Sequence, residues 1–222
     1  MTMRGVFVTG TDTGVGKTRV ATALLRTLAA SGVRAVGMKP IAAGIEPNAA
    51  ANTDVIALAL AGNVAAPLDE RNPYAFADAV APHLAAQAAG IAIDLATIDR
   101  AARRLAARAD ALVVEGAGGA CVPLDDRHDM LDVAVLLDLP VLLVVGMRLG
   151  CLNHALLSAL AIRRRGLMLA GWIANMLPPP MPLADANVHA LTLRLGMPPL
   201  AIVETGDVPL LRGETLATLG GQ

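Results

Sequence analysis

The chain has 222 residues, of which 55% are hydrophobic and 17% charged, and its formal net charge is -1. A chain this apolar can bury a sizeable core, which excludes intrinsic disorder, and its near-neutral charge argues against a general attraction to nucleic acid or to anionic membranes. The length fits one domain over residues 1–222, and the longest uncharged stretch, 166–184, contains four prolines that exclude a membrane-spanning helix.

Six short apolar runs alternate along the chain with segments of helical periodicity. The runs are continuously apolar, which is typical of parallel strands covered on both faces. The sequence therefore predicts an α/β fold, a doubly wound and mainly parallel sheet with helices on both faces. The predicted strands are 5–9, 33–38, 111–115, 141–146, 169–175 and 200–203, the predicted helices are 17–30, 53–61, 95–107, 130–137, 152–165 and 184–195, and residues 41–90 include a predicted insertion at the open end of the sheet.

The first predicted strand is followed by a glycine-rich segment, Gly10 to Thr18, that leads into a predicted helix. Ligands of an open parallel sheet bind beyond the carboxyl ends of its strands. Here the backbone N–H groups can bind phosphate oxygens, Lys17 can reach the β- and γ-phosphates, and the Thr18 hydroxyl can bind Mg²⁺. The common pattern has its first glycine where this chain has Thr11, and an ordinary glycine-rich turn is the alternative. The ending Gly16-Lys17-Thr18 favours a P-loop, a site for a nucleoside triphosphate.

Lysine is rare in this chain, because only Lys17 and Lys39 are lysines among 18 basic residues. A lysine kept where arginine is otherwise used indicates a compact point charge in a tight anion site. Lys39 follows the second predicted strand, so we expect it to bring a second cation to the γ-phosphate. The alternative is a solvent-exposed charge at the end of a strand.

Two carboxylates are candidates for a metal site. Glu115 ends the third predicted strand, where a carboxylate can hold Mg²⁺ directly or through water. Asp54 follows Asn52 and Thr53, and it can equally be a residue that starts a helix. The glycine-rich bend after Glu115, 116–119, offers further backbone amides to an oxyanion.

Five segments, in this order and spacing, resemble the dethiobiotin synthetase family, ATP-dependent ligases of biotin biosynthesis. The resemblance covers residues 6–175 and fades after Asn175. It is carried by VTGTDTGVGKT at 8–18, KP with Gly44 at 39–44, VEGAGG at 114–119, VG with LGCLNH at 145–154, and AGWIAN at 170–175.

The resemblance implies a reaction and its participants. In this family 7,8-diaminononanoate and CO₂ give dethiobiotin at the expense of ATP, through a carbamate and a carbamic-phosphoric mixed anhydride. Such phosphoryl transfer needs charge neutralisation and in-line positioning, and proximity favours ring closure by the neighbouring amine. A cytoplasmic enzyme is expected, because Cys121 and Cys151 indicate no disulfide framework.

The resemblance also implies which residues form the site. Lys17 and Lys39 would be catalytic, and Mg²⁺ would be held by Thr18, Asp54 and Glu115. ATP would be bound by Thr13, Gly14, Val15, Gly16, Lys17, Thr18, Arg19 and Asn175, the last through the adenine edge. The substrate would be bound by Thr11, Lys39, Ala43 and Gly118 of one subunit and by Gly150, Cys151, Leu152 and Asn153 of its partner in a homodimer.

The partner's contribution would be a helix N-terminus that binds the distal carboxylate of the substrate; a simple strand-to-helix connection is the alternative for this segment. The sequence departs from the family pattern at three places. Ala43 stands where a serine or threonine is usual, Gly14 replaces an acidic residue of some members, and the adenine-side segment 206–209 fits only with inserted residues.

Two other functions share parts of this pattern. A dimerising switch ATPase of the chromosome-partition or septum-positioning kind shares the fold, but it usually carries an additional lysine near the start of the loop, and this chain has none before Lys17. An amide-forming enzyme acting on a corrin precursor would need a glutamine-hydrolysing domain with its own catalytic cysteine and histidine. Both alternatives are therefore weaker than the ligase.

Overall fold

The computed structural model describes residues 3–46 and 49–206. Its strands are β1 (Gly5–Gly10), β2 (Ala35–Met38), β3 (Ile41–Ala43), β4 (Tyr74–Phe76), β5 (Ala111–Glu115), β6 (Val141–Met147), β7 (Leu169–Met176) and β8 (Ala201–Val203). Its helices are α1 (Lys17–Ala30), α2 (Thr53–Ala61), α3 (Leu68–Arg71), α4 (Pro82–Ala89), α5 (Leu95–Ala106), α6 (Met130–Leu137), α7 (Cys151–Arg164) and α8 (Ala184–Leu195). None of the described helices has the length and apolar character needed to cross a membrane.

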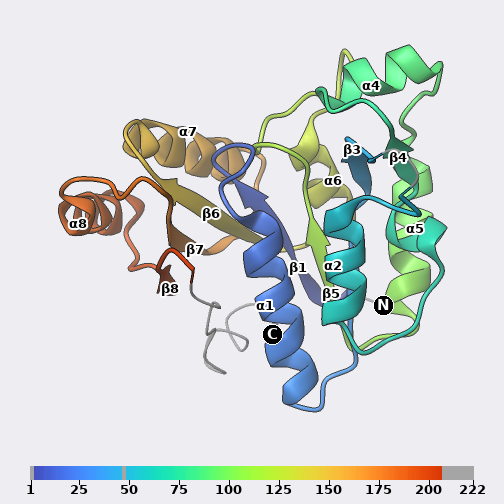
Figure 1. The fold of residues 1–222 in the computed structure, drawn as a ribbon, viewed down its shortest axis with the longest axis horizontal. Coiled ribbons are helices and arrows are strands. Elements are labelled where there is room, and N and C mark those ends of the chain that lie inside the picture. Colours follow the sequence, from blue (N-terminus) through green and yellow to red (C-terminus); the bar gives the residue numbers. More distant parts are fainter. Residues whose placement is uncertain (1–2, 47–48, 207–222) are drawn as a thin grey trace.

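Six strands form one parallel sheet in the order β2-β5-β1-β6-β7-β8 (Figure 1). The chain places β2 and β5 on one side of β1 and then crosses to β6 on the other side. A crevice for ligands opens where the strand order reverses in this way, beyond the carboxyl ends of the strands. The loop after β1 lies at that point.

The sheet is covered on both faces, with α1 and α2 in front of it in Figure 1 and α5, α6 and α7 behind. Alternate residues of a strand point to opposite faces. Val6 and Val8 of β1 therefore pack with Leu24 of α1 in one core, and Phe7 packs with Ile98 of α5 in the other. Burial on both sides explains why the strands read as continuous apolar runs.

Side-chain caps fix where several helices begin. The Asn52 side chain accepts a hydrogen bond from the Asp54 N–H at the start of α2. At α6, Asp129 and Asp132 form a capping box, in which each carboxylate accepts from backbone N–H of the same turn. Such caps leave a sequence signal, and the predicted starts of α2 and α6 are confirmed.

Eight predicted boundaries shift by one or two residues, and three of them illustrate the size of the shift. The strand expected over 33–38 begins at Ala35, because side chains of Asn63 and Asp110 bind the backbone of Val33 and Arg34. Helix α7 starts at Cys151, one residue early, and α5 ends at Ala106, one residue early.

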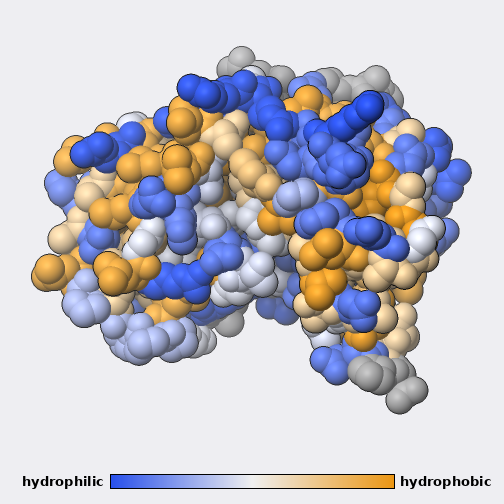
Figure 2. Space-filling view, turned by 90° about the horizontal axis from the view of Figure 1, so that it is seen from above, coloured by the Kyte–Doolittle hydropathy of each residue, from blue (hydrophilic) through white to orange (hydrophobic). Residues whose placement is uncertain are grey.

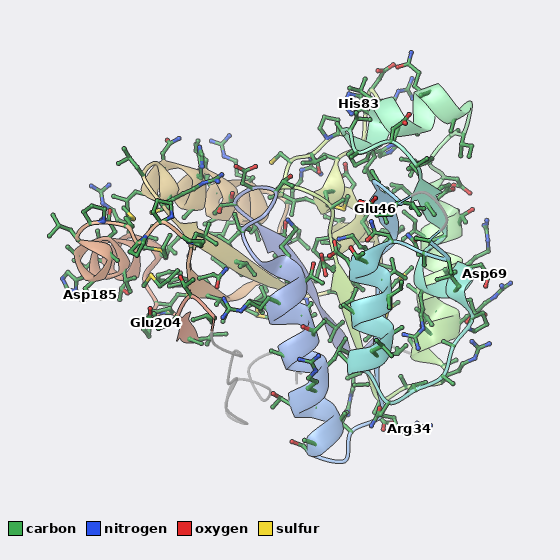
Figure 3. All side chains as sticks on the ribbon, in the orientation of Figure 1. Arg34, Glu46, Asp69, His83, Asp185 and Glu204 are labelled. Atoms are coloured by element: carbon green, nitrogen blue, oxygen red, sulfur yellow. The ribbon has the colours of Figure 1, made fainter. Side chains whose placement is uncertain are left out.

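The predicted insertion folds at one side of the sheet and contains a small sheet of its own, the parallel pair β3 and β4. These two strands were not predicted, since each has three residues and shows no recognisable period. Helix α4 carries His83 at the end of the molecule where the main strands finish, and Arg34 lies at the opposite end (Figure 3).

Candidate active site

A cavity of about 740 Å³ opens at the carboxyl ends of β1, β2 and β5. Figure 2 looks onto this end of the molecule and shows it hollowed between the part with α7 and α8 and the part with α4. The cavity is lined by Thr13, Gly14, Gly16, Lys17, Thr18, Arg19, Lys39, Ala43, Asp54, Ala79, Val80, Ala81, Pro82, Glu115, Ala117, Gly118 and Val122. Most of the residues expected to bind nucleotide, metal and substrate thus line the same cavity.

At the bottom of the cavity lies a buried charge cluster. The Lys39 ammonium donates to Asp54 Oδ2 at 2.8 Å and to Glu115 Oε1 at 2.7 Å. The Thr18 hydroxyl donates to the same Glu115 oxygen at 2.8 Å. Lys39 is 5% exposed and Glu115 is fully buried. The ends of β2 and β5 and the starts of α1 and α2 thereby meet in this cluster.

The cluster fixes the charge of its members. Burial alone would lower the pKa of Lys39, but the carboxylates of Glu115 and Asp54 outweigh it and raise the pKa above its ordinary value. Burial likewise works to raise the pKa of Asp54, and the Lys39 ammonium outweighs it and lowers that pKa. Lys39 is therefore a permanent cation in this site.

Lys17 has a different environment. Its ammonium donates to the Asp12 carbonyl at 2.9 Å. Burial, and then repulsion from Lys39, lower the pKa of Lys17 from 10.5 to about 8. The second lysine is thus a cation whose charge is costly until an anion neutralises it.

The phosphate-binding loop depends on two glycines with left-handed backbone angles, Gly14 at φ 74° and Gly16 at φ 92°. A Cβ atom at Gly16 would lie 2.3 Å from Asn175 Nδ2, whereas one at Gly14 would meet nothing within 4 Å. Asn175 Nδ2 donates to the Val15 carbonyl at 2.8 Å. Asn175 of β7 therefore supports the loop directly.

Asn175 and Arg19 link the phosphate-binding loop to the last strand. Arg19 donates to Asn175 Oδ1 at 3.1 Å and to the Glu204 carbonyl at 2.7 Å, and Glu204 lies just after β8 (Figure 3). Asn175 is 2% exposed and does not line the main cavity. The segment 206–209 is a further candidate for the adenine side of the site, and its residues 207–209 lie outside the described part of the chain.

The expected substrate residues do not all meet in the main cavity. Thr11 lines a separate cavity of about 320 Å³ together with Asp12, Cys121 and His154. Gly150, Cys151, Leu152 and Asn153 line neither cavity. Cys151 is buried, and Asn153 is exposed on α7. In this chain the segment 150–153 is therefore separate from Lys39 and Glu115.

Several residues around the site were not predicted. Arg148, between β6 and α7, pairs with the Asp12 carboxylate of the phosphate-binding loop. Ala79 to Pro82 line the cavity from the insertion; the proline that starts α4 is a helix-start signal that marks this segment in the sequence. Arg148 leaves no comparable signal, because its partner lies far away along the chain.

The oxygen ligands present suit magnesium. Glu115 Oε2 is buried without a hydrogen-bond partner among the described residues, beside the Thr18 hydroxyl and the Asp54 carboxylate. No cluster of three or more His, Cys, Asp or Glu side chains within residues 3–46 and 49–206 could hold a metal by itself. A partial set of oxygens fits Mg²⁺, which keeps waters and binds substrate phosphates as well.

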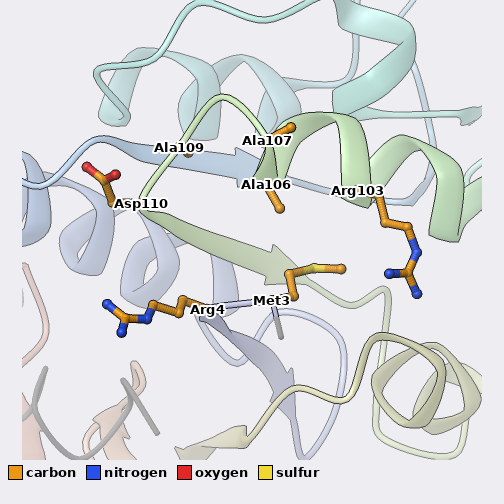
Figure 4. Close-up of a pocket in the computed structure, with 7 residues that line it drawn as sticks. All are labelled: Met3, Arg4, Arg103, Ala106, Ala107, Ala109 and Asp110. Carbon is orange, nitrogen blue, oxygen red and sulfur yellow. The ribbon is translucent and has the colours of Figure 1, made fainter. Parts of the chain in front are cut away.

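A further cavity of about 640 Å³ lies at the opposite end of the strands, where β1 and β5 begin (Figure 4). Two of the charged residues in its wall are already paired, Arg103 with Asp99 and Asp110 with Arg34. It is remote from both lysines and holds none of the predicted site residues.

The chain is similar to known proteins over most of its length. The model of a family described as "AAA domain" matches residues 4–210. An ATP-dependent dethiobiotin synthetase of Nitrosospira multiformis is 52% identical over 200 residues, which cover 90% of this chain and 88% of that protein. One of Aromatoleum aromaticum is 51% identical over 202 residues, 90% of each chain.

Solved structures share the fold. The septum site-determining protein MinD of Pyrococcus horikoshii, complexed with Mg-ADP, is 17% identical with a TM-score of 0.56, covering 98% of this chain and 86% of that one. A ParA family ATPase of Chlorobium tepidum is 9% identical with a TM-score of 0.55, covering 98% and 90%. These likenesses confirm the P-loop α/β fold, and the sequence relatives decide the family. The chain belongs to the dethiobiotin synthetases, ATP-dependent ligases of biotin biosynthesis that form carbon–nitrogen bonds.

Proposed function

We propose that this chain closes the ureido ring of dethiobiotin from 7,8-diaminononanoate, CO₂ and ATP, through a carbamate and a carbamic-phosphoric mixed anhydride. One observation carries the proposal. A phosphate-binding loop and a second, permanently charged lysine, Lys39, line the same cavity. A switch ATPase is not favoured, because the relatives that share half the sequence are dethiobiotin synthetases.

The chemistry has three steps. One substrate amine attacks CO₂, forms a C–N bond and loses a proton, which gives a carbamate. A carbamate oxygen attacks the γ-phosphorus of ATP and the bond to ADP breaks, which gives the mixed anhydride. The neighbouring amine attacks the carbamate carbon and loses a proton, the C–O bond breaks, and phosphate leaves with the former carbamate oxygen.

The residues of the cavity supply positioning and charge. Two anions must approach one another, so neutralising cations lower the barrier more than a general base would. Lys39 offers a charge that two carboxylates keep in place, and it would face the carbamate and the transferring phosphoryl group. Lys17 and the loop amides of 13–18 would bind the β- and γ-phosphates.

The remaining roles are those that the family resemblance implies. Thr18, Asp54 and Glu115 would hold Mg²⁺, which supplies further neutralisation of phosphate charge. Asn175 and Arg19 would bind the adenine end of ATP. Thr11, Ala43 and Gly118 would contact the substrate head, with no side-chain hydroxyl at Ala43.

The distal end of the substrate needs a second binding site, and we assign it to a partner subunit in a homodimer. Residues 150–153 stand at the start of α7. The Cys151 N–H there donates to the Arg148 carbonyl at 3.0 Å, and the N–H groups of Leu152 and Asn153 have no backbone acceptor within the helix, so they can bind a carboxylate. The partners of the reaction are small molecules, with no nucleic acid or membrane. The cysteines Cys121 and Cys151 are free, which suits the reducing cytoplasm.

The test is phosphate release by the purified protein with ATP, bicarbonate and diaminononanoate, each omitted in turn. We expect release to require all three. Lys39→Gln, which keeps hydrogen-bond donors and removes the charge, should nearly abolish this release and leave ADP binding within about twofold. Release that continues without the diamine, or full turnover by Lys39→Gln, would contradict the proposal.

A further inference from the structure

The backbone of Lys39 is held by the insertion rather than by the main sheet. Strand β2 is the edge strand of that sheet, so its outer edge has no neighbouring strand. The Lys39 N–H nevertheless donates to the Arg71 carbonyl at 2.9 Å. The Lys39 carbonyl accepts from Asn72 Nδ2 at 2.8 Å. Both backbone polar groups of this lysine thus bind one dipeptide.

The Asn72 amide joins two segments that lie far apart in the sequence. Its second N–H donates to the Tyr74 carbonyl at 2.9 Å, and the Tyr74 N–H donates to the Pro40 carbonyl at 3.1 Å. Pro40 has no N–H of its own, so an ordinary strand ladder is interrupted there. Asn72, which is 6% exposed, closes this gap between the end of β2 and the start of β4.

The dipeptide is itself anchored firmly. The Arg71 guanidinium donates to the carbonyls of Gly37 at 3.2 Å and Val64 at 2.6 Å. Arg71 is 5% exposed, and its buried side chain holds residues 71–72 against β2. The dipeptide that binds the Lys39 backbone is therefore itself hydrogen-bonded to β2 and to the segment before α3.

We infer that Asn72 is a positioning residue for Lys39. The inference rests on the role proposed for Lys39. A lysine ammonium at the end of a flexible stem reaches a defined point only if its backbone is fixed, and Lys39 Nζ must lie between Asp54 and Glu115 while facing the carbamate. Loss of the Asn72 amide leaves the Lys39 carbonyl unbound and lets the backbone shift, which moves the ammonium with it.

The chain offers a matched control at the other end of the same strand. The Asn63 side chain accepts from the Ala35 N–H at 2.8 Å and donates to the Val33 carbonyl at 3.0 Å. Asn63 and Asn72 therefore each make two hydrogen bonds to backbone beside β2. Only Asn72 binds Lys39, so the two alanine variants separate a loss of stability from a loss of positioning.

The experiment compares Asn72→Ala, Asn63→Ala and Lys39→Gln for kcat of diamine-dependent phosphate release, ADP affinity and thermal unfolding. We expect Asn72→Ala to lose about tenfold to a hundredfold in kcat, the effect of a displacement near 1 Å, with ADP affinity within about twofold. Asn63→Ala should lose thermal stability and keep its kcat. Asn72→Ser, which retains one donor, should show a smaller loss of kcat, and it replaces the alanine variant if that one does not fold.

The outcomes are distinguishable. If Lys39→Gln loses turnover while the Asn72 variants match Asn63→Ala in kcat, the positioning role is wrong and the proposed function stands. If Asn72→Ala loses ADP affinity as much as kcat, the effect is a general structural one and the positioning role is again wrong. If Lys39→Gln keeps its turnover, the proposed function fails and the positioning role fails with it.

Discussion

At the scale of single residues, the two lysines of the cavity have opposite electrostatic properties. Lys39 lies between two carboxylates and keeps its charge. Lys17 has a carbonyl as its hydrogen-bond acceptor and a second cation nearby, so its pKa falls to about 8. The phosphate-binding loop thus contains a lysine whose charged form is favoured further when an anion binds.

This difference predicts a pH dependence for Lys17. Between its folded pKa of about 8 and its ordinary value of 10.5, the unfolded chain binds more protons than the folded one. The charged lysine therefore destabilises the fold below about pH 8, and this cost disappears as the pH rises through that window. Nucleotide phosphates favour the charged form, so binding inside the window must take up a proton.

Calorimetry with ADP in the absence of magnesium measures that proton. In buffers of different ionisation enthalpy, we expect proton uptake on ADP binding near about pH 9 and almost none near about pH 7. Lys17→Arg stays charged at both values and should show no uptake at either. Equal proton exchange at both pH values in the unmodified protein would mean that the Lys17 pKa is not lowered.

At the scale of elements, most of the fold could be predicted, because the signals for its strands and helices lie within each segment of the sequence. Apolar runs indicated the six strands of the main sheet, and side-chain caps marked helix starts such as Thr53 and Met130. The pair β3 and β4 could not be predicted, because three-residue strands have no period. The role of Asn72 could not be predicted, since its hydrogen bond to the Lys39 carbonyl depends on how the insertion folds back over β2.

The phosphate-binding loop offers a prediction about its glycines. Gly14 and Gly16 both have positive φ, so alanine strains the backbone at either position by about 1 kcal/mol. A Cβ at Gly16 would also collide with Asn175 Nδ2 at 2.3 Å, and one at Gly14 meets nothing. We expect Gly16→Ala to weaken ADP binding about tenfold or more, because Asn175 must move, and Gly14→Ala to change it about fivefold at most.

Titration calorimetry or fluorescence with ADP measures both glycine variants, and thermal unfolding shows whether they are folded. The matched pair separates backbone strain from the collision. Equal losses of affinity in the two variants would mean that Asn175 does not support the loop.

At the scale of the whole molecule, the site within one subunit accounts for ATP and the reacting amines but not for the far end of the substrate. Leu149 is 92% exposed, and Asn153 beside it faces solvent on α7. We expect this exposed segment to bind the far end of the substrate from the other subunit of a homodimer. The sequence could predict this role for 150–153 only through the family resemblance, because no pattern within one chain shows a partner, and the homodimer stays a prediction.

Asn153→Ala tests the composite site. We expect the Asn153 side-chain amide to donate to the distal carboxylate beside the backbone N–H groups of this helix start. Its loss should raise the KM for the diamine about tenfold to a hundredfold, the value of a hydrogen bond to a charged group, with the KM for ATP unchanged. An effect confined to ATP would show that the assignment is wrong.

Mixed dimers of Asn153→Ala and Lys39→Gln sharpen this test. After subunit exchange at low diamine concentration, about a quarter of the sites in an equal mixture combine an intact Lys39 with an intact Asn153 from the other subunit. Activity should therefore reappear on mixing. Activity no higher than the mean of the two separate variants would place both residues of one site in the same subunit.

The central claim is that Lys17 and Lys39 hold a carbamate against the terminal phosphate of ATP, and the path of oxygen tests it most directly. With ¹⁸O-labelled bicarbonate and unlabelled water, in reactions shorter than the exchange of CO₂ with water, each phosphate released should carry one labelled oxygen from CO₂. Phosphate that instead takes its new oxygen from water would mean that the site hydrolyses ATP, and it would contradict the account.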